Sequence, residues 1–250
     1  MFKRAMVALV SIAALLVSSI TPTVAVAADP VPATLRFTSS FPYTSPPSQF
    51  DVVNQVLDFA NGAGTREHRH GGDAFVSVLE GQITRTSGDD VRSYAPRQTF
   101  TEPKDSLHSV RATGRTRVFA SFLLSPGAIQ TVNDPNYPAP EALNTAPIVQ
   151  KTTVNTQPEE FTVTQQVYDF APGAVLPLHT HGGQGLATVM EGELTFVTST
   201  GSQQRAVNTS FSNITAQHEV RNNGSANATL LVVVLLPKGA EATSYVTTGV

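Results

Sequence analysis

The chain has 250 residues, of which 40% are hydrophobic and 14% charged, and its formal net charge is −3. It contains no cysteine, which excludes disulfides, thiolate nucleophiles and cysteine-ligated zinc. No basic stripe is visible, which argues against a nucleic-acid partner. The low charge and the frequent Gly and Pro residues favour an all-β fold over a helical one.

The first 28 residues are typical of an export signal. Lys3 and Arg4 give a positive start, an apolar run follows from Ala5 to about Ile20, and small residues lead to Ala28. The run is short for a membrane span, which needs about 20 apolar residues. We therefore expect a secreted or periplasmic protein without membrane attachment after cleavage, and a retained membrane anchor is the alternative.

The next segment, residues 29–50, is rich in Pro, Ser and Thr. Its composition is compatible with a linker or with an arm that lies across the following domains.

An internal repeat divides the rest of the chain. Residues 55–60 (QVLDFA) match residues 166–171 (QVYDFA) at an offset of 111 residues. The repeat predicts one domain over residues 51–127 and a second over residues 159–250. The proline-containing stretch between them, residues 128–158, is expected to be a linker.

Each copy is expected to consist of short strands joined by turns. The apolar runs Ala74–Leu79 and Leu186–Met190 both stop at a Glu-Gly pair, where glycine with positive φ is expected to turn the chain back. No segment has a long helical period. The strands of one copy would close into a barrel or jelly roll around an interior pocket.

Six histidines carry the strongest functional signal. All lie at matched positions of the two copies: His68, His70 and His108 in the first, and His179, His181 and His218 in the second. Residues i and i+2 of a strand point to the same face, so each His-x-His pair can face the barrel interior. A single histidine is more often an ordinary core or surface residue, but the repetition of the whole pattern favours a metal site in each copy. Three imidazoles would leave positions open for water, oxygen or substrate.

These residues also resemble a known family. Gly62-x5-His68-x-His70, continuing to a Glu-Gly pair, resembles the first cupin motif, and the stretch from Gly173 to His181 resembles it again. The stretch from Pro103 to His108 resembles the second cupin motif. The resemblance implies two tandem cupin barrels, also described as double-stranded β-helix jelly rolls. As a whole the chain is similar to the bicupins, a group that includes oxalate decarboxylases and quercetin dioxygenases.

One departure from the family pattern concerns the metal ligands. The family usually has a glutamate four residues after the second histidine, where this chain has Ala74 and Gly185. Asp73 and Gln184, one step earlier, would point away from the metal unless the strand bulges, so they are less favoured as fourth ligands. Sites with imidazole ligands alone suit Fe, Ni, Cu or Zn, one ion per domain, better than Mn or Mg. The missing carboxylate also removes an obvious general base, which counts against a mechanism like that of oxalate decarboxylase.

The surroundings of the two histidine pairs differ in the sequence. Arg66 alternates onto the face of His68 and could bind an anionic group of a substrate, although a solvated surface arginine is an equal alternative. The second copy has Leu176, Pro177 and Leu178 near its pair, so its entrance is expected to be more apolar. The two sites are therefore not expected to be equivalent.

Two classes of function fit these features. The first is an exported metal-dependent oxidoreductase acting on a small organic substrate, dioxygenase-like as the resemblance to quercetin dioxygenases implies; an isomerase or hydrolase would use the same site as a Lewis acid. The second is a non-catalytic module that binds metal or a small ligand. Exposed barrel edges would permit a homodimer.

Overall fold

A computed structural model describes residues 31–44, 46–136, 148–155, 160–212 and 216–246. The predicted export signal, residues 1–28, lies outside this part of the chain. Within it, no helix is long and apolar enough to cross a membrane.

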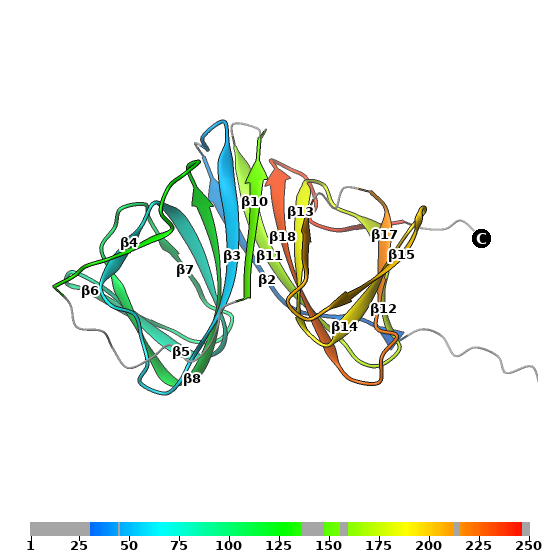
Figure 1. Cartoon of the computed structure of the whole chain (residues 1–250), viewed down its shortest axis with the longest axis horizontal. Coiled ribbons are helices and arrows are strands. Elements are labelled where there is room, and N and C mark those ends of the chain that lie inside the picture. Colours follow the sequence, from blue (N-terminus) through cyan, green and yellow to red (C-terminus); the bar gives the residue numbers. More distant parts are fainter. Residues whose placement is uncertain (1–30, 45, 137–147, 156–159, 213–215, 247–250) are drawn as a thin grey trace, which may run out of the picture.

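Two β-barrels lie side by side (Figure 1), and the predicted all-β fold with two tandem barrels is confirmed. The first barrel contains β3 (Phe50–Phe59), β4 (His68–His70), β5 (Gly72–Ser87), β6 (Asp90–Tyr94), β7 (Thr99–Glu102), β8 (Ser109–Leu124), β9 (Thr131–Asn133) and β10 (Ile148–Val154). The second contains β1 (Val31–Pro32), β2 (Thr34–Tyr43), β11 (Phe161–Phe170), β12 (Ala174–Thr180), β13 (Gln184–Glu191), β14 (Glu193–Thr198), β15 (Gly201–Ala206), β16 (Ser210–Ser212), β17 (His218–Arg221), β18 (Ala228–Pro237) and β19 (Ser244–Tyr245).

The sheets of the two barrels have matching orders. The first barrel has a main sheet in the order β10-β3-β8-β5-β6, with β7 paired to β5, and a two-stranded sheet of β4 and β9. The second has one sheet in the order β16-β13-β18-β11-β2 and another in the order β1-β12-β17-β14-β15, with β19 paired to β12. In both, the first strand of the repeat pairs antiparallel with the last long strand, as Val56 with Phe119 and Val167 with Leu231.

The barrels exchange strands across the repeat. Strand β2, which precedes the first copy, pairs antiparallel with β11 of the second barrel. Strand β10, which precedes the second copy, pairs antiparallel with β3 of the first barrel. The segment 29–50 contains β1 and β2, and the segment 128–158 contains β9 and β10. Both segments therefore contribute strands to the barrels.

A shared core joins the barrels where their sheets face each other. Its side chains come from both copies, and the rings of Phe50 and Phe161 stack there with centroids 5.7 Å apart. A buried polar bridge crosses the same interface: Gln165 of β11 accepts a hydrogen bond from Ser77 (2.5 Å) and donates one to Ser121 (2.8 Å). Because a buried hydrogen-bonding group left without a partner costs about 1–3 kcal/mol, this bridge fixes the register of the two sheets.

The Glu-Gly pairs differ from the sequence prediction. Gly81 and Gly192 do have positive φ, 73° and 69°. The chain does not turn back at Gly81, however, because β5 runs on to Ser87 with an irregular register around Glu80 and Gln82. The predicted reverse turn is therefore wrong: Gly81 forms a bulge that bends one long strand, and Gly192 lies between β13 and β14, which belong to different sheets.

Candidate metal centre

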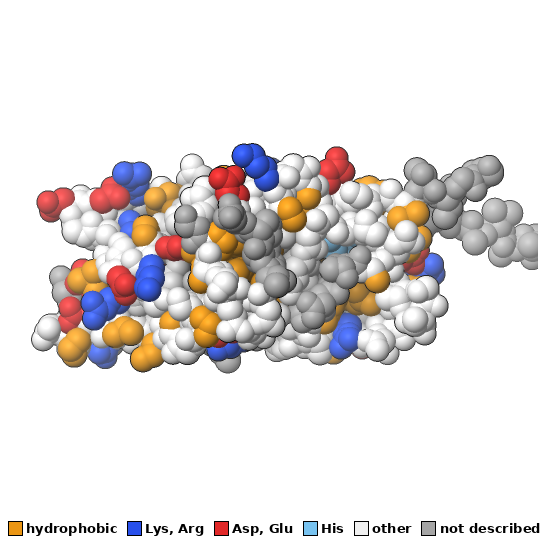
Figure 2. Space-filling view, turned by 90° about the horizontal axis from the view of Figure 1, so that it is seen from above, with side chains coloured by type: hydrophobic (Ala, Val, Ile, Leu, Met, Phe, Trp, Pro, Cys, Tyr) orange, Lys and Arg blue, Asp and Glu red, His pale blue; other side chains and the backbone are white. Residues whose placement is uncertain are grey.

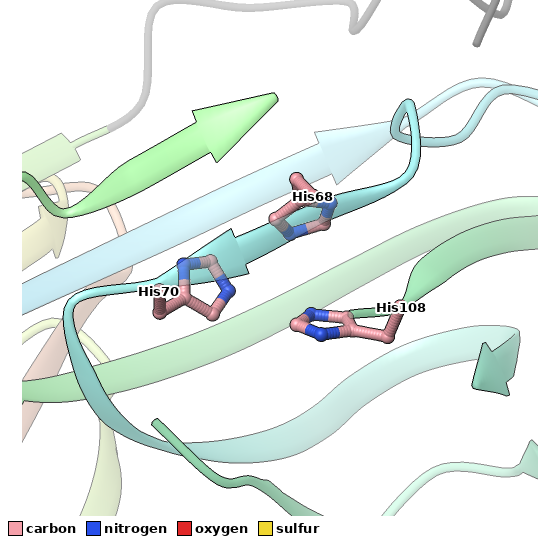
Figure 3. A group of neighbouring side chains, drawn as sticks. All are labelled: His68, His70 and His108. Atoms are coloured by element: carbon pink, nitrogen blue, oxygen red, sulfur yellow. The ribbon is translucent and has the colours of Figure 1, made fainter. Parts of the chain in front are cut away.

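Three histidines converge inside the first barrel, as Figure 3 shows, and we call them the first trio. His68 and His70 lie on β4, and His108 forms an isolated bridge with His68 just before β8. All three are buried, with ring centroids 4.4 to 5.1 Å apart. One nitrogen from each ring lies within 4.8 Å of the other two, which is close enough for the three to hold one metal ion.

The second trio, His179, His181 and His218, has the same arrangement. His179 and His181 belong to β12 and the residue after it, and His218 opens β17, where it pairs with His179. The ring centroids are 4.2 to 5.2 Å apart, and the side chains are again buried with nitrogens within 4.8 Å of one another. The structure thus brings together all six histidines that the sequence singled out.

Backbone carbonyls set the orientation of every imidazole. In the first trio Nδ1 donates to the carbonyls of Arg66 (2.7 Å), Gln130 (2.9 Å) and Ser106 (2.8 Å). In the second trio Nδ1 donates to the carbonyls of Pro177, Ala242 and Ala216, at 2.7 to 2.9 Å. A carbonyl can only accept, so Nδ1 carries the proton and Nε2 of the neutral ring has a free lone pair. This is the arrangement that ligating histidines use.

A short return segment holds the middle histidine of each trio. Strand β9 pairs with β4 and brings the carbonyl of Gln130 to His70. Strand β19 pairs with β12 in the second barrel, and the nearby carbonyl of Ala242 meets His181. Sequence reasoning missed both, because a backbone carbonyl leaves no mark on residue type.

The Gly-Gly pairs after the histidines are required by close packing. A Cβ on Gly72 would lie 1.9 Å from the carbonyl oxygen of Leu123, and one on Gly183 would lie 1.9 Å from that of Leu235. No side chain fits at that distance. Gly72 opens β5 and Gly183 directly precedes β13, so the glycines let these two strands begin in close contact with the last long strand of each barrel.

Burial favours the neutral form of four of the six imidazoles. It lowers the pKa of His68 and the pKa of His179 to about 4, and it also lowers the pKa values of His181 and His218. Neutral imidazoles are the form that binds metal, so these rings are ready to ligate at neutral pH.

The first trio has a carboxylate neighbour that the sequence analysis did not identify. Glu102, at the end of β7, is buried, with Oε2 3.1 Å from Nε2 of His70 and Oε1 3.1 Å from Nε2 of His108. Burial alone would raise the pKa of Glu102, but the two imidazoles lower it to about 2. The first barrel therefore does have a carboxylate beside its trio, contrary to the expectation from Ala74. A signal did exist in the sequence, because Glu102 alternates with Phe100 and so shares its inward face.

The less favoured fourth ligands lie elsewhere. Asp73 accepts a hydrogen bond from the backbone nitrogen of Lys104 (2.7 Å) and also interacts with Tyr43. Gln184 is half-buried at the start of β13. Neither position is part of a trio.

A cavity of about 410 Å³ adjoins the first trio. Its inner wall is apolar, with Leu57, Phe59, Val76, Ile83, Phe100 and Val118 among the lining residues. Polar residues that are partly or fully exposed line the rest, among them Thr65, Arg66, Thr131 and Asn133. Arg66 is one of the exposed residues at this cavity. In Figure 2 charged side chains are more numerous over the half occupied by the first barrel.

Aromatic rings lie near both trios, and in the first barrel the ring of Phe122 lies 4.8 Å from that of His70. The ring of Tyr245 lies 6.2 Å from that of His179, and the ring of Phe196 lies 6.3 Å from that of His218. Tyr168, which corresponds to Leu57 in the repeat, is buried in the second barrel.

The donor set fits a transition-metal ion. Among the described residues, Nε2 of His108 is buried and has no hydrogen-bond partner of acceptable geometry, although Glu102 lies 3.1 Å away. A buried lone pair aimed at two other imidazole nitrogens is costly unless a cation occupies the space between them. His68, His70 and His108 could therefore hold one ion, and the second trio another.

Comparison with known proteins agrees with this description. Residues 55–122 match the family model of the cupin domain. A structure of Bacillus subtilis oxalate decarboxylase concerned with its Mn(II) centres is similar over 85% of this chain and 80% of that chain, at 12% identity and a TM-score of 0.52. A structure of the same enzyme at pH 4.6 covers 83% and 74% at 13% identity and a TM-score of 0.52, and a mutant covers 86% and 77% at 12% identity and a TM-score of 0.54. No curated protein matches the sequence at a significant level. At these identities the likeness concerns the fold, which is that of two tandem cupin barrels.

Proposed function

We propose that this protein of two tandem cupin barrels is a metal-dependent enzyme that oxidises a small organic substrate with dioxygen, and that its active site is in the first barrel. One observation carries the proposal: the imidazoles of the first trio lie beside a cavity of about 410 Å³. A cavity with an apolar wall and a few convergent polar groups is the usual form of a small-molecule site.

The residues of the chain have separate tasks in this proposal. His68, His70 and His108 hold the ion through Nε2, and the backbone carbonyls of Arg66, Gln130 and Ser106 keep the rings in place. The bound ion would supply Lewis acidity and open coordination positions. The apolar wall binds the carbon skeleton of the substrate and excludes water from it.

The lining of the cavity indicates a substrate class. A mostly apolar wall with Arg66 at the exposed side suits a small apolar molecule that carries one anionic or enolic oxygen group. Flavonols, catechols and diketones have this chemistry, and they are the compounds to test first.

We propose Fe, Ni, Cu or Zn as the resident metals, one ion in each barrel. The ion in the first barrel is proposed to be the catalytic one, because the cavity of about 410 Å³ adjoins that trio.

The experiment combines metal analysis with an oxygen-uptake screen. The purified protein is analysed for metals and then mixed with flavonols, catechols and diketones in an oxygen-electrode cell. We expect bound Fe, Ni or Cu and oxygen uptake that depends on one substrate class. Bound Zn without oxygen uptake would contradict an enzyme that uses dioxygen. It would favour a hydrolase, an isomerase or a non-catalytic binding module.

A second candidate is decarboxylation of a small carboxylic acid without net oxidation. The buried carboxylate of Glu102 beside the first trio favours it, since such a group can exchange protons with a bound acid. The similar solved structures are named as oxalate decarboxylases. Release of CO2 without oxygen consumption, from oxalate or larger carboxylic acids, would distinguish this reaction from the first.

We also propose that the protein is exported, on the basis of the charged, apolar and small residues in positions 1–28. The full chain is produced in a bacterial host, and the N-terminus of the exported product is sequenced. A mature start near Asp29 is expected, and an uncleaved, membrane-bound product would contradict the proposal.

Self-association is a further proposal. Strands β2 and β10 are edge strands of their sheets, and edges of this kind can pair with a second copy. Light scattering of the purified protein would give twice the chain mass if a homodimer forms and the monomer mass if it does not.

A further inference from the structure

The carboxylate of Glu102 lies beside two of the three imidazoles of the first trio. Its two oxygens lie 3.1 Å from Nε2 of His70 and from Nε2 of His108. Two ligand atoms at right angles around one ion, each about 2.1 Å from it, are about 3.0 Å apart. The spacing of Glu102 from both histidines is therefore that of neighbouring ligands of one ion.

The charges of these groups also require a cation. Nδ1 of His70 and of His108 donates to a backbone carbonyl, so a second proton on Nε2 would make either ring a cation. The ionised carboxylate of Glu102 presents lone pairs to both Nε2 atoms. Lone pairs facing each other at 3.1 Å in a buried site repel unless a proton or a metal ion lies between them.

The second barrel has no matching acidic residue in its sequence. Phe100 pairs with Val76 as Phe211 pairs with Ala187, so the repeat aligns Glu102 with Asn213, which lies outside the described residues. No Asp or Glu occurs anywhere between residues 194 and 218. The pKa shifts of the second trio arise from burial, backbone hydrogen bonds and the other histidines of that trio.

We infer that Glu102 is a fourth metal ligand in the first barrel, so that the two sites of one chain select different ions. The first site has three nitrogens and one carboxylate oxygen and accepts Mn²⁺ or Fe²⁺ readily. The second has three nitrogens and favours Ni²⁺, Cu²⁺ or Zn²⁺, because Mn²⁺ prefers oxygen ligands. This inference rests on the proposed function insofar as both trios must bind metal.

The test uses two backgrounds of the full chain, each with one intact trio. His179→Ala/His181→Ala leaves the first site, and His68→Ala/His70→Ala leaves the second. Mn²⁺ and Zn²⁺ affinities are measured by calorimetry, and bound Mn²⁺ is followed by electron paramagnetic resonance. We expect the first-site background to bind Mn²⁺ at least about tenfold more tightly than the second-site background, with a smaller difference for Zn²⁺.

The decisive variant is Glu102→Gln in the first-site background, which keeps the shape of the side chain and removes its charge. It should lower the Mn²⁺ affinity by about 10- to 100-fold and change the resonance spectrum of bound Mn²⁺. An unchanged Mn²⁺ affinity would overturn the inference while leaving the proposed function intact. Absence of Mn²⁺ and Zn²⁺ binding in both backgrounds would overturn the proposed function and the inference together.

A rescue variant separates ligation from folding. Ala74 of β5 lies directly opposite Glu102 of β7, and cross-strand neighbours share a face with Cβ atoms about 5 Å apart. Glu102→Ala/Ala74→Glu should therefore return the carboxylate to the site and restore Mn²⁺ binding, whereas Glu102→Ala/Ala74→Gln should not. Equal Mn²⁺ affinities of these two variants would contradict a ligand role for the carboxylate.

Discussion

In the first barrel the histidine trio adjoins a cavity and faces Glu102, whereas in the second barrel Phe196 and the exposed Tyr245 lie near the trio. The trios themselves are alike, because each imidazole is held by a backbone carbonyl and each middle histidine by a return segment. The features that both barrels share therefore form a site with three imidazole nitrogens. The side chains that line each interior determine which molecules can reach that site.

The linings differ at defined positions of the repeat. Leu57, Val118 and Ala120 line the first cavity, and the register of the sheets places the larger Tyr168, Leu230 and Val232 at the matching positions. Two other positions change the opposite way, since Val76 and Phe122 are matched by Ala187 and Val234. The second barrel thus has larger side chains at three of these positions and smaller ones at two, so the two linings differ in shape.

The largest effect is expected from the close glycines, which both barrels share. Gly72→Ala and Gly183→Ala should each lower the free energy of unfolding by about 3 kcal/mol or more, because the new Cβ would overlap a carbonyl oxygen. Denaturant titration measures the loss. Gly88→Ala is the control: this glycine has positive φ but open space around it, so a cost of about 1 kcal/mol is expected. Similar losses of unfolding free energy in all three variants would show that Gly72 and Gly183 lie less close to the carbonyl oxygens than described.

The next largest effect is expected when three residues that line the first cavity are replaced by the larger residues at the matching positions of the second barrel. Leu57→Tyr/Val118→Leu/Ala120→Val should lower turnover at least about 100-fold by filling the cavity, with the metal content unchanged. The reciprocal control, Tyr168→Leu/Leu230→Val/Val232→Ala, should leave the turnover of the folded fraction unchanged. Full activity of the filled first barrel would place the active site elsewhere.

The metal-free protein should lose stability in acid. His68 and His179 have a pKa of about 4 when folded, against 6.5 in the unfolded chain, so their contribution is complete above pH 6.5 and is lost as the pH falls towards 4. The loss amounts to at most about 3 kcal/mol for each histidine. Glu102 has a folded pKa of about 2 against 4.5, so its contribution is present above pH 4.5 and is lost only below that.

Melting curves between pH 7.5 and pH 4, recorded after a chelator has removed bound metal from the protein, would measure this loss of stability. His68→Ala and His179→Ala should each flatten the decline between pH 6.5 and pH 4. A melting temperature that does not change across this window would contradict the buried, neutral state of His68 and His179.

The smallest effect is expected at the edge of the first cavity. Arg66→Ala should raise KM for an anionic substrate about 5- to 10-fold with little change in kcat, because an exposed ion pair contributes modestly to binding. Arg69 is the matched control, since it is exposed on β4 but does not line the cavity. Equal effects of Arg66→Ala and Arg69→Ala would reduce the role of Arg66 to general surface charge.

The sequence predicted those features of the two barrels that depend on residues close together in the chain. Strand alternation places His68 and His70 on one face, and the internal repeat brings His179 and His181 to the same place in the second barrel. The glycines after each pair and the fold class follow from the same motifs.

Long-range pairing explains what was not predicted. The exchange of β2 and β10 depends on which sheet edge each strand meets, and both segments are too irregular in sequence to indicate a partner. Glu102 reaches the first trio through its pairing with Ala74, and the motif itself shows only the alanine. The backbone carbonyls of Gln130 and Ala242 accept hydrogen bonds from His70 and His181. Any residue type has such a carbonyl, so the sequence cannot indicate these contacts.

Metal stoichiometry of three proteins tests the central claim most directly: the full chain, His68→Ala/His70→Ala and His179→Ala/His181→Ala. Each is loaded with Zn²⁺, freed of excess ion and analysed by mass spectrometry. The account predicts two ions per chain for the unchanged protein and one for each double variant. A chain that retains no ion, or one whose ion content is unaffected by either pair of substitutions, would contradict it.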